Sequence, residues 1–218
     1  MGTKSTRKDF YMEIRKSSGR FISILFIVAL GVAFFSGIRS SEPSMRLTGD
    51  AYFDGANLFD IKTVSTLGIT REDIRALQDV DHVAKAEGSY SADFLSKTED
   101  EQYVLHVMAL QKDMNEVAVT DGRLPEKIGE CLADDEMGYK VGDKITLKSG
   151  TSNPVSDTLK TEKLTVVGTG SSPCYISFGR GSAAIGTGSI DGFLIVPEQT
   201  FDMEAYTEAY VQVAGQRN

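Results

Sequence analysis

The stretch Phe21–Ile38, FISILFIVALGVAFFSGI, decides the fold class of this chain. Its eighteen residues carry no charge, and twelve of them are Phe, Ile, Leu or Val. As a helix the stretch would be about 27 Å long, close to the roughly 30 Å hydrocarbon core of a bilayer. Each large apolar side chain gains about 0.3–0.6 kcal/mol near the centre of a membrane helix. The stretch therefore predicts a transmembrane helix.

Two other interpretations of this stretch remain open. A cleaved secretory signal would need a small-residue exit such as Gly31-Val32-Ala33, and cleavage there would leave Phe34 and Phe35 on the new terminus. A core helix of a soluble protein rarely shows so long an uncharged run between two arginines. A membrane span accounts for those arginines, because Arg20 and Arg39 can reach the two headgroup layers as membrane-interface anchors.

The distribution of charge predicts the orientation of the span. Residues 1–20 contain six Lys or Arg and two Asp or Glu, a net charge of +4, and only Arg39 and Arg46 follow the stretch closely. Because basic segments near a span stay in the cytoplasm, the N-terminus is expected inside the cell. The residues after Ile38 are then expected outside.

The basic leader has two interpretations of its own. Phe10, Tyr11, Ile14 and Phe21 recur at helical spacing between basic residues, which fits a short interfacial helix. An unstructured basic leader explains the charge equally well. The expected organisation is a basic cytoplasmic leader over residues 1–20, a transmembrane helix over 21–38 and an extracytoplasmic domain over 39–218.

Composition excludes several classes of protein. The chain has 218 residues, a net charge of -8, 41% hydrophobic and 25% charged residues, and two Cys. This hydrophobic content excludes a wholly disordered chain, and two Cys exclude a disulfide-dense scaffold. The acidic balance argues against a nucleic-acid partner, since phosphate backbones select clustered Lys and Arg.

The segment after the span reads as mixed α/β. A helix over Arg71–Val80 is expected, with Thr70 as its N-cap and Asp73 completing a capping box. Runs with strand character, separated by Gly and Pro, are 60–65, 82–87, 103–110, 116–120, 144–148, 164–168, 193–196 and 209–213. Pro197-Glu198-Gln199 opens a possible helical turn. The fold class is therefore α+β, a single N-terminal transmembrane helix followed by a mixed α/β extracytoplasmic domain.

Sequence motifs for catalysis or cofactor binding are weak. The chain has no Gly-Lys dipeptide for a phosphate loop and no Gly-x-Ser-x-Gly elbow. Residues 179–184, GRGSAA, match a dinucleotide pattern after the strand-like Tyr175–Phe178. Gly186 and Gly188 lie where the required helix should continue, so a flexible loop is the favoured interpretation.

The candidate metal ligands and thiols are equally sparse. His82 and His106 stand alone on strand-like segments and are expected to be partly exposed. Asp134-Asp135-Glu136 lacks the spacing of a calcium loop and is expected to be a solvated acidic turn. Cys131 and Cys174 could pair on an oxidising side or remain free thiols. We therefore predict no enzyme, no metal and no cofactor.

Several runs resemble one family of membrane proteins. Residues 10–21, FYMEIRKSSGRF, followed by the span and by 37–41, GIRSS, look like the start of an FtsX-like ABC transporter permease from Gram-positive bacteria. The runs 121–125, DGRLP, 138–147, GYKVGDKITL, and 164–168, LTVVG, resemble the MacB-like periplasmic core domain of those permeases.

The resemblance implies a bacterial plasma-membrane permease subunit for transmembrane transport. Its partners would be the lipid bilayer, a separate cytoplasmic ABC ATPase subunit, and the remaining permease spans or a second permease subunit. Such systems export or extract peptides, lipoproteins, lipids or drugs. Family permeases have at least four spans, so this chain is expected to form the N-terminal portion.

Two other functions stay open beside the permease. The main alternative to the permease is a single-pass interaction or sensor protein that acts on an envelope partner without an ATPase. A weaker third interpretation is a membrane-tethered extracellular enzyme, which would need a cleft with a perturbed acid or base.

Overall fold

The computed structural model describes residues 3–97, 101–177 and 179–215. It comprises two compact units, residues 1–52 and 53–218. The first unit is helical, and the second, which we call the β unit, contains all the described strands.

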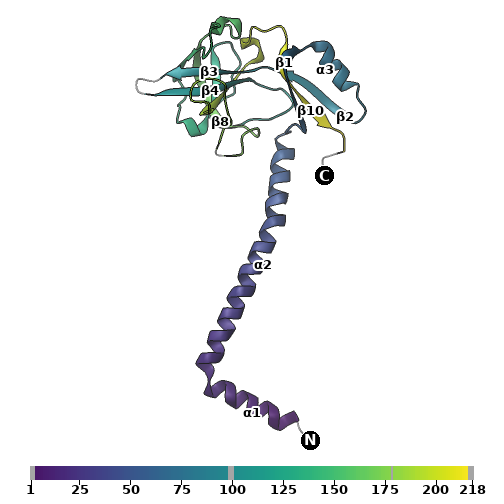
Figure 1. The fold of residues 1–218 in the computed structure, drawn as a ribbon, viewed down its shortest axis with the longest axis vertical. Helices are drawn as coiled ribbons and strands as arrows, with labels where there is room; N and C mark the ends of the chain where they lie inside the picture. The colour runs from purple at the N-terminus through teal and green to yellow at the C-terminus, as the bar shows by residue number, and fades with distance from the viewer. Residues whose placement is uncertain (1–2, 98–100, 178, 216–218) are drawn as a thin grey trace. The chain divides into compact units, whose positions relative to one another are not determined.

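The helical unit contains α1 (Thr3–Lys16) and most of α2 (Ser18–Gly55), whose residues 53–55 belong to the β unit (Figure 1). The uncharged stretch lies inside α2, but the helix continues past Ile38. Hydroxyl groups of Ser41, Ser44 and Thr48 donate to carbonyl oxygens four residues earlier, and Arg46 pairs with Glu42 one turn away. These bonds suit a helix, so the mixed α/β region begins after Gly55 and not directly after Ile38.

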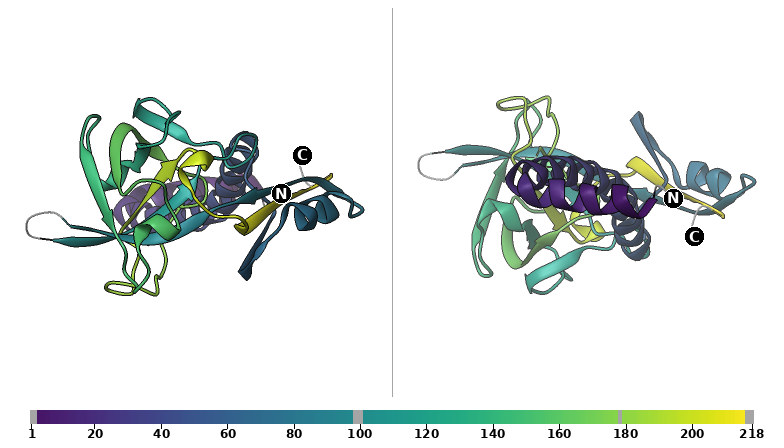
Figure 2. Two further views of the ribbon diagram at one scale, coloured as in Figure 1. Left: turned by 90° about the horizontal axis from the view of Figure 1, so that it is seen from above. Right: turned by 90° about the horizontal axis from the view of Figure 1, so that it is seen from below.

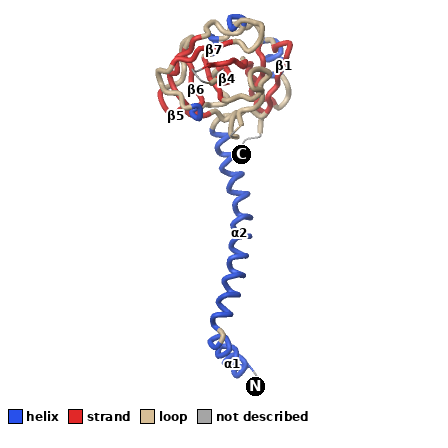
Figure 3. The backbone as a smooth tube through the Cα atoms, turned by 60° about the vertical axis from the view of Figure 1, so that its left-hand side comes forward, coloured by secondary structure: helices blue, strands red, loops and turns tan. Residues whose placement is uncertain are grey.

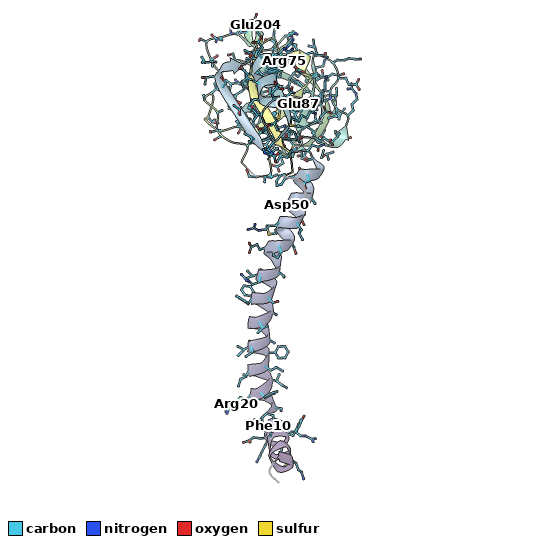
Figure 4. The ribbon with its side chains drawn as sticks, turned by 90° about the vertical axis from the view of Figure 1, so that its right-hand side faces the viewer. Phe10, Arg20, Asp50, Arg75, Glu87 and Glu204 are labelled. Carbon is cyan, nitrogen blue, oxygen red and sulfur yellow. The ribbon has the colours of Figure 1, made fainter. Side chains whose placement is uncertain are left out.

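The apolar side chains of α2 have no cover within the protein. Among the described residues, α2 is the one helix long and apolar enough to cross a bilayer, and no part of its apolar window is buried. Figure 4 shows its side chains standing free along the helix, with Arg20 near the start and Asp50 toward the other end. Phe34 and Phe35 are 72% and 68% exposed.

The basic leader forms the helix α1, as the interpretation of a short interfacial helix requires. Phe10 and Tyr11 of α1 are exposed, at 63% and 73%. Whether α1 lies at a membrane interface stays a prediction.

A three-stranded antiparallel sheet opens and closes the β unit. Its strands are β1 (Ile61–Ile69), β2 (Val83–Ser89) and β10 (Tyr206–Val213), with β10 between the other two. Helix α3 (Arg71–Gln78) packs on one face through Ile74, against Ala86 and Val211 (Figure 1). The predicted capping box is confirmed, because Thr70 and Asp73 bond each other's backbone N–H groups.

The remaining strands form a barrel inserted between β2 and β10 (Figures 2 and 3). They are β3 (Ser91–Lys97), β4 (Gln102–Ala109), β5 (Ala118–Gly122), β6 (Glu130–Asp134), β7 (Lys144–Lys148), β8 (Lys163–Ser171) and β9 (Gly192–Val196). The short 3₁₀ helices are η1 (Asp135–Met137), η2 (Val155–Asp157) and η3 (Glu198–Thr200). The order is β5-β8-β6-β9-β4-β3-β7, and β7 also pairs with β8. This last pairing closes six strands into a ring, which removes their free edges.

Alternation along the strands fills both faces of the barrel wall. In β9, Leu194 and Val196 join the main core cluster, whereas Phe193 and Ile195 pack in a second cluster on the other face. Each of the five residues of β9 is buried. This double burial explains why the strand reads as a continuous apolar run.

The structure corrects several local predictions. Strands β3 and β6 were not expected, and His82 lies in a turn with positive φ instead of a strand. Residues 175–177 form no strand, and Phe178 lies outside the described residues. After Gly181 the chain continues as an irregular loop with a single Ser182–Ser189 bridge, so no helix follows the dinucleotide pattern.

The three runs that carry the MacB-like resemblance meet at one place. The backbone N–H of Arg123 donates to Val167, and that of Gly142 donates to Val166, both on β8. Val166 donates in turn to the carbonyl of Asp143. Glycine is required here, since a Cβ on Gly168 would lie 2.3 Å from the carbonyl oxygen of Arg123.

We expect Gly168→Ala to lower the free energy of unfolding by about 3 kcal/mol, because the added methyl group meets backbone atoms that cannot move aside cheaply. Gly179→Ala is the matched control, since a Cβ there has no neighbour within 4 Å. Denaturant unfolding of the detergent-solubilised chain, followed by circular dichroism, measures both. Equal stability of the two variants would show that this close approach is unimportant.

Candidate functional site

The two predicted membrane anchors both lie on α2. Arg20 is near its first turn and Arg39 near its middle, and both are exposed. Nineteen positions of helix separate them by about 28 Å, which matches a hydrocarbon core. Their role in the membrane stays a prediction.

The two cysteines are free thiols in separate environments. Cys131 is buried in the main core cluster, where burial raises its pKa to about 12. Cys174 is partly exposed in the loop after β8, and burial also raises its pKa. Neither thiol is therefore a reactive nucleophile at neutral pH.

His106 forms a local pair with a carboxylate on the neighbouring strand. Its Nδ1 atom lies 2.6 Å from Oδ1 of Asp93 on the neighbouring strand β3. Within residues 3–97, 101–177 and 179–215, no group of three or more His, Cys, Asp or Glu side chains could hold a metal ion.

The environment of Asp134 differs most from the one predicted from the sequence. This residue was expected in a solvated acidic turn, but its side chain is fully buried and binds the guanidinium of Arg180 through two hydrogen bonds of 2.7 and 2.9 Å. Arg180 also lies 5.8 Å from the ring centres of Tyr175 and Phe193. The pair fastens the long loop between β8 and β9 onto the barrel wall.

A buried carboxylate joins the small sheet to the barrel. Glu208 on β10 accepts hydrogen bonds from Tyr210 and from Ser91 of β3, and forms a 2.6 Å ion pair with Lys62 of β1. Burial among these groups, with the Glu208 carboxylate beside it, raises the pKa of Tyr210. Because the backbone N–H of Ser91 also donates to the hydroxyl oxygen of Thr207 on β10, the two parts are fixed to each other.

Segments between the strands line an open groove of about 640 Å³, which we call the junction groove. Its lining includes Tyr90 and Phe201, whose rings stack at 5.4 Å, and the exposed Leu124. A second hollow of about 240 Å³ shares Leu110 and Lys112 with it and reaches the small sheet. Because Tyr90 and Phe201 are only 8% and 4% exposed, the apolar surface of the groove comes mainly from Leu110 and Leu124.

Charged side chains from three segments also line the junction groove. They are Lys112 after β4, Glu126 before β6 and Glu198 in η3. In the part of the chain that the structure describes, none of the three side chains has an ion-pair partner. These charges are thus available to a ligand.

The wall that carries Glu126 is held in place by its neighbours. The carboxylate of Glu130 binds Arg123 at 2.6 Å and accepts the backbone N–H of Glu126, which lowers the pKa of Glu130 to about 2. The side chain of Gln199 donates to the carbonyl of Glu126. The groove was not predicted, because its residues come from distant segments that share no motif.

Comparison with known proteins gives structural likenesses only. No protein-family model and no curated protein matches the chain. Solved structures similar to it include the extracellular domain of the ABC-type transporter YknZ from Gram-positive bacteria, at 14% identity and a TM-score of 0.44 over 70% of this chain and 76% of that one.

Two further structures are similar over comparable lengths. One is the periplasmic region of MacB from Actinobacillus actinomycetemcomitans, at 10% identity and a TM-score of 0.42 over 73% of this chain and 69% of that one. The other is a domain of a putative permease protein from Porphyromonas gingivalis, at 15% identity and a TM-score of 0.38 over 71% and 70%.

We expect Arg180→Met to destabilise the β unit by about 3–5 kcal/mol, because it leaves the buried carboxylate of Asp134 without its partner. Arg75→Met, on the exposed face of α3, is the control and should change stability by less than about 0.5 kcal/mol. Combining Arg180→Met with Asp134→Leu should recover part of the loss. Denaturant unfolding measures all three, and an unchanged Arg180→Met variant would contradict the role of this pair.

Proposed function

We propose that this chain is a permease subunit, the N-terminal portion of an FtsX/MacB-type ABC transport system. The β unit lies outside the plasma membrane and α2 crosses it, while a separate cytoplasmic ATPase supplies the energy. The system exports or extracts a peptide, lipoprotein, lipid or drug. The observation that carries this proposal is the combination of an uncovered apolar helix with a folded β unit in which the family-like runs interlock.

The placement in the membrane follows from charge and length. Residues 1–20 form the cytoplasmic leader, and Arg20 and Arg39 lie at the two headgroup layers. Cytoplasmic retention of the basic leader and the separation of the two arginines both support this placement.

The interlocked turns support the family assignment at the level of residues. The runs that resemble the MacB-like core come from three separate stretches of the sequence, which are Asp121–Pro125, Gly138–Leu147 and Leu164–Gly168. In the β unit they bond to one another around β8. Such mutual dependence gives a physical reason for the three runs to occur together.

The competing function is a single-pass interaction or sensor protein that works without an ATPase. It would use the same span and the same β unit. The two proposals differ in what accompanies the chain in the membrane.

We expect an ATPase with a Walker A motif to co-purify with the affinity-tagged full-length chain from membranes of its own bacterium. Addition of ATP with vanadate should increase its recovery, because trapping holds the transporter assembled. An unrelated single-span protein with the same tag is the control. Recovery of envelope proteins without any ATPase would contradict the permease and favour the sensor.

A further inference from the structure

Strand β1 lies at an edge of the small sheet and exposes apolar side chains there. Among the strands that the structure describes, β1 pairs with β10 alone, so its other edge has no strand beside it. Edges of this kind are commonly protected by charged side chains. The one charged residue of β1 is Lys62, and the buried carboxylate of Glu208 engages its charge at 2.6 Å. Val64 and Leu67 are instead 67% and 96% exposed.

A bulge does not explain this apolar edge. The register of β1 against β10 shifts between Val64 and Ile69, and bulges can turn an edge away from further pairing. Protection of this kind favours polar side chains, but Leu67 lies within the bulge with almost its whole side chain in water. Residues 61–64 keep their regular pairing with β10, which leaves an extended edge for a further strand. The edge therefore suits contact with another apolar segment.

An open hollow of about 460 Å³ lies beside this edge, between β1 and α3. Its lining includes Thr63 and Ser65 of β1, Ala76 and Leu77 of α3, and the exposed Val80. Helix α3 is fastened toward β2, because the side-chain amide of Gln78 donates to the carbonyl of Ala86 on that strand. The helix therefore covers the β2 side of the sheet and leaves its own face of β1 open.

The order of the small sheet specifies which element fits this place. Strands β1 and β2 each run antiparallel to β10, which lies between them, so β1, α3 and β2 form a split β-α-β unit. A strand added at the free edge of β1, and antiparallel to it, would run parallel to β10. A helix that leads from one strand to a parallel strand of the same sheet makes a right-handed crossover in nearly all proteins.

This handedness places the helix of a second crossover. The crossover from β1 to β2 and one from β10 to the added strand run in opposite directions and step toward opposite edges of the sheet. Two right-handed crossovers related in this way have their helices on the same face. The second helix would therefore lie beside α3, over the hollow, where its apolar side chains would cover Leu77 and Val80. The resulting β-α-β-β-α-β arrangement is a recurrent motif.

We propose that the free edge of β1 and the hollow beside α3 form the docking site for a helix and a strand of the remaining permease portion. The helix is amphipathic and packs beside α3, and the strand pairs antiparallel with β1. Both contacts remove apolar surface from water. The inference rests on the proposed function, because the permease supplies this portion. Docking joins the β unit to the rest of the permease through a folded contact outside the membrane.

The accessibility of a thiol at position 67 tests this docking. Because Leu67 is almost fully exposed, Leu67→Cys should fold as the parent chain does, with an unchanged unfolding midpoint. Its rate of labelling by a maleimide is measured in the 218-residue chain in nanodiscs. The same rate is measured in open membrane fragments of its own bacterium, where the complete permease carries the same substitution.

We expect the labelling rate of Leu67→Cys to be at least about tenfold lower in the membrane fragments, because a covered thiol is out of reach of the reagent. Thr151→Cys, at an exposed position of the β unit, is the matched control. Its labelling rate should differ by less than about twofold between the two preparations.

Photo-cross-linking identifies the segment that covers the site. Leu67→p-benzoylphenylalanine is introduced into the permease in its own bacterium, and the cross-linked peptides are sequenced by mass spectrometry. We expect adducts with a segment of the remaining permease portion in which an amphipathic helix pattern precedes a strand pattern. Val119→p-benzoylphenylalanine places the same group at an exposed apolar position of another edge strand, β5, and should give no adduct with that segment.

Three results would overturn the docking proposal. Equal labelling of Leu67→Cys in the two preparations, when the tagged chain still co-purifies an ATPase, would refute docking and leave the permease proposal standing. Adducts between two copies of β1 would assign the edge to self-pairing. Adducts with lipid, or with a protein that has no membrane span, would assign it to the bilayer or to an envelope partner.

Discussion

The uncharged stretch of α2 cannot remain in water, and the placement proposed for the rest of the protein depends on this constraint. Its large apolar side chains are exposed, and no described part of the protein covers them. Removing such surface from water is the dominant favourable term in folding, so a helix of this kind requires another apolar medium. A bilayer supplies that medium at the right thickness.

In the β unit, the strands of the barrel are inserted in the sequence between two strands of the small sheet. Strands β1, β2 and β10 form one sheet although more than a hundred residues separate β2 from β10. The barrel closes through β8, which pairs with β5, β6 and β7. The carboxylate of Glu208 then ties the two parts together at a buried point.

Local signals in the sequence predicted local structure well. The capping box of α3 and the strand β7 occur where composition and spacing placed them, because both depend on neighbours within a few residues. Strand β6 was missed because it pairs with the distant strands β8 and β9. Strand β3 was missed although its main partner, β4, is the next strand along the chain. The extension of α2 to Gly55 was missed because hydroxyl side chains bond to the helix and not to turns.

The junction groove and the Asp134–Arg180 pair could not be read from the sequence for a similar reason. Asp134 looks like any acidic turn residue until the loop after β8 returns Arg180 to it, 46 positions later. The closed barrel brings together groove residues from segments that are distant in the sequence, among them Tyr90, Leu124, Glu198 and Phe201. Long-range pairing of this kind leaves no periodic trace in one chain.

Cysteine labelling in intact cells tests most directly whether α2 crosses the membrane and leaves the β unit outside. Thr151→Cys places a thiol at an exposed position of the β unit, and Lys8→Cys places one in the leader. We expect a membrane-impermeant maleimide to label the Thr151→Cys variant in intact cells and the Lys8→Cys variant only after lysis. The parent chain should show little labelling. Labelling of the Thr151→Cys variant only after lysis would contradict this placement.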